Sequence, residues 1–167
     1  MPPVPQLHPA RVPATGVGRA LYARPGLLAL VFVGGAVGTT LRYLLASRWP
    51  AGDGQWPWTT FAVNLTGSFA LGALLTVLAR GGSDDGVRRR LRLGLGTGLL
   101  GGYTTYSTFI LETDQLLRTG HGTTAVVYAL VSVVLGVAAA VVGVVAGRGV
   151  PVRRTKPSRR PSPVRAR

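Results

Sequence analysis

Residues Thr123–Ala146 read TTAVVYALVSVVLGVAAAVVGVVA, a stretch without a single charged side chain. An α-helix needs about 20 consecutive apolar residues to cross the hydrocarbon core of a bilayer, and this stretch is long enough. It therefore predicts a membrane-spanning helix. It also assigns the chain to the all-α integral membrane class.

Working outward from this segment, three further apolar stretches are found at Leu27–Ala46, Trp58–Ala79 and Leu91–Leu117, the last of them interrupted by polar residues. Hydrophobic residues make up 47% of the chain and charged residues only 14%, against roughly 25% charged in an average soluble domain. We therefore predict four membrane-spanning helices, which form one domain over residues 25–147.

The two ends of the chain differ from this domain in composition. Residues 1–24 are rich in proline and contain no apolar core, so they do not form a cleavable signal peptide. Residues 148–167 are rich in arginine and proline. Because neither segment can bury enough apolar surface to offset the entropy of ordering, we predict that both are disordered.

The formal net charge is +14, and the cations are strongly segregated. Apart from Arg42, Arg48 and Arg118, every Lys and Arg lies before the first span, between the second and third, or after the fourth. These residues are Arg11, Arg19, Arg24, Arg80, Arg88, Arg89, Arg90, Arg92, Arg148, Arg153, Arg154, Lys156, Arg159, Arg160, Arg165 and Arg167. The positive-inside rule then predicts that both termini face the cytoplasm.

Composition also excludes several classes of function. The basic tail has no interleaved aromatic residues, which favours topology and contact with anionic membrane lipid over nucleic-acid binding. The chain has no cysteine and two histidines, too few for a zinc site. Its spans contain neither paired carboxylates nor a Ser, His and Asp set, so the chain is not expected to be an enzyme.

Small residues recur every four positions within three of the spans, where they allow membrane helices to pack closely. These stripes are Gly34 and Gly38, then Gly94, Gly98 and Gly102, and finally Ser132, Gly136 and Ala140. They predict packing within a bundle or an oligomer.

The middle of the third span reads GGYTTYSTF over Gly101–Phe109. A glycine pair and β-branched threonines both weaken a helix, so we expect a break near residues 101–104. Backbone carbonyls freed at a break inside a membrane are natural ligands for Na⁺. A simple kink, in which threonine hydroxyls bond back to carbonyls, is the alternative.

Tyr106 and Phe109 follow this break and share one helix face. The positive edges of aromatic rings can contact an anion, although ordinary aromatic packing is the more frequent use of such a pair. Donors at similar depth are Asn64, Tyr128 and Ser132, which suit either a pathway for a small anion or hydrogen bonds between helices.

Two charged residues lie nearer the ends of the spans. Arg42 could concentrate anions in a vestibule, and Glu112 follows the aromatic pair. For both, extension of the side chain to the membrane interface is the alternative.

Three segments together resemble the Fluc (CrcB) family of small bacterial fluoride channels. They are GGAVGTTLRY at Gly34–Tyr43, NLTGSFALG at Asn64–Gly72 and GGYTTYSTF at Gly101–Phe109. The resemblance covers about residues 27–147 and rests mainly on the second and third strings, which are far more specific than a glycine stripe.

The resemblance implies an antiparallel dimer with two pores in the bacterial plasma membrane. It also implies that Gly101 and Thr104 give backbone carbonyls to a structural Na⁺ at the dimer centre. The residues that it implies for the fluoride pathway are Asn64, Tyr106, Ser107, Phe109, Tyr128 and Ser132, with Arg42 near a vestibule and Glu112 on the exit path.

Two features depart from the family pattern. Tyr106 stands where the family usually has Phe, which keeps the ring edge but adds a hydroxyl. The segregated cations favour one orientation, whereas an antiparallel homodimer needs one sequence that inserts both ways. We therefore expect a dimer with an oppositely oriented homologue.

The function expected from these observations is passive export of cytoplasmic fluoride, which lowers fluoride toxicity. A small four-span coupled exporter of cationic drugs is the main alternative, but it needs a carboxylate in the first span and Leu27–Ala46 contains none. A non-transporting envelope or assembly protein is the other alternative, and it gives no reason for the polar run in the third span.

Overall fold

The structure, a computed structural model, describes residues 25–152. These residues form helices and the segments that connect them, and they contain no β-strand. The predictions of disorder for 1–24 and for most of the tail lie outside the described residues. The helices are α1 (Pro25–Arg48), α2 (Trp58–Arg80), α3 (Gly86–Leu91), η2 (Arg92–Leu100), α4 (Gly101–Tyr103), α5 (Ser107–Arg118) and α6 (Gly122–Gly149).

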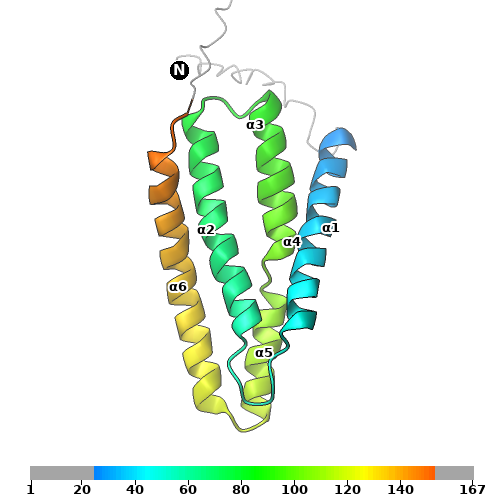
Figure 1. The fold of residues 1–167 in the computed structure, drawn as a ribbon, viewed down its shortest axis with the longest axis vertical. Coiled ribbons are helices and arrows are strands. Elements are labelled where there is room, and N and C mark those ends of the chain that lie inside the picture. The colour runs from blue at the N-terminus through cyan, green and yellow to red at the C-terminus, as the bar shows by residue number, and fades with distance from the viewer. Residues whose placement is uncertain (1–24, 153–167) are drawn as a thin grey trace, which may run out of the picture.

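The chain crosses the bundle four times (Figure 1). The helices α1, α2 and α6 are each long and apolar enough to span a membrane by themselves. The elements α3, η2, α4 and α5 together form the remaining crossing, which is interrupted as the sequence predicts. The structure thus confirms an all-α fold of four crossings.

Successive crossings run in opposite directions, so the described part of the chain starts and finishes at the same end of the bundle (Figure 1). The connection from α2 to α3 also lies at this end. The described cations of this end are Arg80, Arg88, Arg89, Arg90, Arg92 and Arg148. Arg48 and Arg118 end helices at the opposite side, so the segregation of charge along the sequence is also a segregation in space.

Side chains of this cationic end tie the helices together. Arg80 Nη1 donates to the carbonyls of Gly147 and Val150, both at 2.8 Å, and so joins the end of α2 to the end of α6. Arg92 Nε donates to Asp84 Oδ1 at 3.0 Å, and this hydrogen bond holds the pKa of the Asp84 carboxyl below its usual value. The connection to the third crossing is therefore anchored by its own ion pair.

Glycines bring the backbones of two pairs of crossings together. The helix α1 packs along η2 and α4, while α2 packs along α6. A Cβ atom at Gly38 would meet the backbone of Leu99 and Tyr103, and one at Gly98 would meet that of Val31 and Gly34. The predicted stripes in the first and third crossings are therefore contact faces between these two segments.

The small-residue stripe predicted in the fourth crossing is only partly correct. Ala140 contacts α2, but a Cβ atom at Gly136 would have nothing within 4 Å. Gly143 and Gly147 make the close approach to α2 instead. Gly143 and Gly147 lie about two and three turns beyond Gly136 on the same helix face, so the close approach to α2 is confined to the C-terminal half of α6.

The break in the third crossing comes slightly later than its glycine pair. Gly101 and Gly102 remain helical, Thr104 is extended at φ −77° and ψ 156°, and α5 begins at Ser107. The break therefore occupies residues 104–106. It begins at the last residue of the expected interval 101–104 and extends two residues beyond it. It is preceded by a π-helix, η2, which the sequence analysis did not predict. Such widened turns occur often at functional sites.

Candidate functional site

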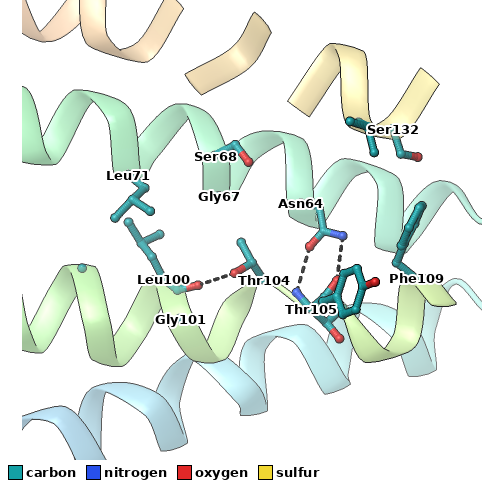
Figure 2. Close-up of a pocket in the computed structure, with 13 residues that line it drawn as sticks. Asn64, Gly67, Ser68, Leu71, Leu100, Gly101, Thr104, Thr105, Phe109 and Ser132 are labelled. Atoms are coloured by element: carbon teal, nitrogen blue, oxygen red, sulfur yellow. Dashed lines mark hydrogen bonds between the residues drawn. The ribbon is translucent and has the colours of Figure 1, made fainter. Parts of the chain in front are cut away.

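A cavity of about 350 Å³ lies beside this break, lined by residues of α2, of the third crossing and of α6 (Figure 2). Within the part of the chain that the structure describes, no charged side chain lines it. Of the predicted pathway residues, the cavity brings together Asn64, Tyr106, Phe109 and Ser132. It also includes both residues predicted to bind Na⁺, Gly101 and Thr104.

Asn64 connects α2 to the broken backbone. Its Nδ2 donates to the Thr105 carbonyl at 2.9 Å, and its Oδ1 accepts the Thr105 N–H at 2.8 Å (Figure 2). The side-chain amide thus replaces helical partners that the break removes. Since an amide nitrogen carries two protons, one donor remains for another acceptor. Asn64 therefore has a structural role that the sequence analysis did not foresee.

The two threonines of the break complete its hydrogen bonding. Thr104 Oγ1 donates back to the Leu100 carbonyl at 2.9 Å, as in the simple-kink alternative. Thr105 Oγ1 accepts the N–H of Thr108 at 3.1 Å and so caps the start of α5. Gly67 of α2 makes room for this arrangement, because a Cβ there would collide with the Thr104 methyl group.

These bonds redirect two amides away from their helical acceptors. In an unbroken helix, the N–H of Thr105 would bind the carbonyl of Gly101, and the N–H of Thr108 would bind that of Thr104. Here the first donates to Asn64 and the second to the Thr105 hydroxyl. The break thereby frees the two carbonyls that the resemblance implies as Na⁺ ligands.

Arg42 lies on the other side of the third crossing from the cavity lining. Its Nε donates to the Gly102 carbonyl at 3.3 Å, and Thr39 Oγ1 donates to the same oxygen at 3.4 Å. Both come from α1, and together they satisfy a carbonyl in the last helical turn before the break. Arg42 therefore holds the end of α4, and it is not part of the cavity wall.

A row of aromatic rings leads from the cavity toward the end of the bundle where α5 meets α6. The ring centroids of Tyr106 and Phe109 are 6.3 Å apart, and those of Phe109 and Tyr128 are 5.2 Å apart. Trp56 continues the row at 5.3 Å from Tyr128. The predicted pair is thus part of a longer aromatic group.

The remaining predicted residues lie around this row. Tyr128 is fully buried, and its hydroxyl donates to Glu112 Oε2 at 3.0 Å. Thr60 Oγ1 donates to Glu112 Oε1 at 2.7 Å, so both carboxylate oxygens have a partner. The exposed Ser107 has its hydroxyl 3.3 Å from that of Thr105. These residues adjoin the cavity residues but do not line the cavity.

The donors inside the cavity are neutral. Ser132 Oγ is buried without a hydrogen-bond partner in the described chain, and Asn64 keeps one N–H. Residues 25–152 contain no group of three His, Cys, Asp or Glu side chains that could hold a metal. The cavity can therefore offer a small anion hydrogen bonds and an aromatic edge without a fixed positive charge.

Sequence reasoning missed two polar members of this wall. Thr105 was read only as part of the polar run, and its role as a cap depends on the break itself. Ser68 also lines the cavity. Its position four residues after Asn64, on the same helix face, was the signal that could have found it.

Comparisons with known proteins agree on one family. The profile described as "CrcB-like protein, Camphor Resistance (CrcB)" matches residues 29–144. The "Fluoride-specific ion channel FluC 1" of Cutibacterium acnes is 45% identical over 135 residues, which cover 81% of this chain and 94% of that protein. The "Fluoride-specific ion channel FluC" of Hyphomonas neptunium is 47% identical over 118 residues, covering 68% and 89% respectively.

We predict that Asn64→Ala destabilises the folded protein by about 2 kcal/mol or more, because it strands the N–H and carbonyl of Thr105 away from water. Ser132→Ala is the matched control, since its hydroxyl has no partner to lose. Unfolding of the detergent-solubilised protein by heat or denaturant measures the stability of both variants relative to the parent protein. Equal stability of the two variants would contradict the structural role of Asn64.

Proposed function

This chain belongs to the CrcB family, and we propose that it forms a fluoride-specific ion channel through which fluoride leaves the cytoplasm passively. The family is one of ion channels and not of enzymes, in agreement with the sequence analysis. Hydrogen fluoride that enters from an acidic exterior ionises in the less acidic cytoplasm. Passive escape of the anion then lowers the toxicity of fluoride.

The observation that carries this proposal is the cavity of neutral donors beside the helix break. Fluoride is small and strongly hydrated, so a pathway must replace its water with hydrogen-bond donors. Asn64 and Ser132 supply such donors, and the rings of Tyr106 and Phe109 supply positive edges. Because no cation lines the cavity, an ion that is stripped of water there can still leave.

The other residues of the pathway act beyond the cavity. Tyr128 extends the row of ring edges beyond Phe109, because its hydroxyl proton is already donated to Glu112, and the exposed Ser107 offers a hydroxyl beside the cavity. Glu112, held by Thr60 and Tyr128, borders the exit. Arg42 is anchored through its Nε to the Gly102 carbonyl and attracts anions to a vestibule from outside the cavity wall.

A second subunit completes the channel in this proposal. The ring of Tyr106 is 76% exposed in the single chain, although it adjoins the cavity. A polar run at a helix break is not compatible with a lipid-facing surface, because lipid offers no hydrogen-bond partners. An antiparallel partner that covers the break satisfies this requirement.

We propose that a structural Na⁺ is held at the centre of this dimer by the carbonyls of Gly101 and Thr104. The support is that these carbonyls lose their helical donors to Asn64 and to the Thr105 hydroxyl. A desolvated Na⁺ would neutralise carbonyl dipoles that otherwise lack partners. The carbonyl of Gly102 is not available, since Thr39 and Arg42 already donate to it.

We predict that Na⁺ raises the unfolding temperature of the purified protein in a saturable manner, relative to N-methylglucamine at the same ionic strength. Thr104→Val keeps the carbonyl and should keep this dependence, although it removes a hydrogen bond to Leu100. A protein whose unfolding temperature is the same in both salts does not bind Na⁺ as proposed.

The segregated cations bear on which partner the chain uses. Inversion would carry three cation-rich segments across the membrane, at roughly 2.5–3.5 kcal/mol for each Arg that reaches the bilayer centre. Arg88, Arg89, Arg90 and Arg92 all lie in one of these segments, beside Arg80. We therefore propose a uniform orientation with both termini in the cytoplasm, and a dimer with an oppositely oriented homologue.

We predict that a tag placed after Arg167 is not labelled in intact cells and becomes labelled once the membrane is permeabilised, because the cation-rich end stays inside. A tag in the connection between α5 and α6, at 119–121, is the opposite-side control. Comparable labelling of the C-terminal tag from both sides would mean that the chain inserts both ways and can form the pore by itself.

We predict that liposomes containing the channel release fluoride much faster than chloride, and that release needs no proton gradient. Phe109→Ala should abolish this release, since it removes the ring between Tyr106 and Tyr128, whereas Tyr106→Phe should be tolerated. A fluoride-selective electrode and a chloride electrode measure the two rates. The proposal is wrong if the rates are equal or if release depends on a proton gradient.

A further inference from the structure

Ser68 is a cavity residue without an assigned role. It lies one helical turn from Asn64 on α2 (Figure 2), in the direction of Arg80 and the cationic end of the bundle. Its side chain is half-buried, and it takes part in none of the hydrogen bonds found in residues 25–152. A serine within a helix often bonds back to the preceding turn, so a free hydroxyl at a cavity wall is available to a ligand.

The threonine hydroxyls of the cavity wall are not free to donate to a ligand as the Ser68 hydroxyl is. The hydroxyl of Thr104 donates to Leu100, and that of Thr105 donates to Thr108. On α6, the positions one and two turns beyond Ser132 are Gly136 and Ala140, which carry no donor. Toward the cationic end, therefore, α6 supplies no further hydroxyl after Ser132.

The rest of the cavity wall at this end is apolar. Leu71, Gly96 and Leu100 line it together with Ser68. Four residues of helix rise about 6 Å, so Ser68 and Asn64 mark two levels of one cavity. Among residues 25–152, an anion that approaches Asn64 from the cationic end would meet no side-chain donor at the earlier level except the Ser68 hydroxyl.

We propose that Ser68 Oγ donates a hydrogen bond to the anion at a separate binding position, one turn before Asn64 on the cytoplasmic side. This inference rests on the proposed fluoride channel and adds a residue to it. A hydroxyl bond to an anion is charge-assisted and shorter than a neutral one, which favours a small ion. Two positions in series also let the ion lose its water in two steps.

The test compares fluoride release from liposomes for the parent channel and for Ser68→Ala, Ser68→Cys and Ser68→Thr. Fluoride release through Ser68→Ala should be slower than through the parent channel by about tenfold or more. Release through Ser68→Cys should be slowed as well, because a thiol is a weak donor. Ser68→Thr keeps the hydroxyl and should release fluoride within about twofold of the parent rate.

The matched control is Thr76→Val, which removes a hydroxyl elsewhere on α2 that bonds only to the Gly72 carbonyl. It should leave the fluoride rate unchanged. If the parent channel releases fluoride and Ser68→Ala releases it at the same rate, the proposed role of Ser68 is wrong. The same holds if Thr76→Val slows release as much as Ser68→Ala does. In both cases the proposal of a fluoride channel is unaffected. A parent channel that releases no fluoride even when it is reconstituted with its oppositely oriented homologue overturns both proposals. Where Ser68→Ala does not assemble, Ser68→Cys against Ser68→Thr gives the same comparison.

Discussion

A backbone amide or carbonyl inside a bilayer has no water to bind, and this constraint governs the centre of the molecule. The third crossing is broken at residues 104–106, so its polar backbone must find partners in other segments. Asn64 binds both polar groups of Thr105, and Arg42 with Thr39 binds the carbonyl of Gly102. The first and second crossings therefore both hold the break in place.

Close packing makes these long-range hydrogen bonds possible. A side chain as short as Asn64 reaches a neighbouring backbone only if the helices nearly touch, and Gly67 permits this approach of α2 to Thr104. On the opposite side, Gly34 and Gly38 admit α1 to the backbone of η2 and α4. Small residues thus serve the break as well as the bundle, since they let side chains on two crossings act as substitutes for helical hydrogen bonds.

Charge is arranged so that the lining of the cavity stays neutral. Most of the described cations lie at one end, where Arg80 and Arg92 are engaged in hydrogen bonds, while the cavity is lined by amide, hydroxyl, aromatic and apolar groups. Glu112 lies outside the cavity and is bonded by two hydroxyls. A wall of this kind can dehydrate a small anion without trapping it, because each contact is moderate and several occur in series.

The sequence by itself determined the four crossings, their directions, the segregation of charge and the polar run of the third crossing, because hydropathy and charge are properties of each segment alone. Only the tertiary structure decided where the freed backbone groups of the break find partners. It assigned Asn64 to Thr105, Arg42 to Gly102 and Glu112 to Tyr128, and it placed the close contacts of α6 with α2 at Gly143 and Gly147, further along the helix than Gly136. Such pairings depend on how closely and at what rotation two helices meet, which no single segment contains.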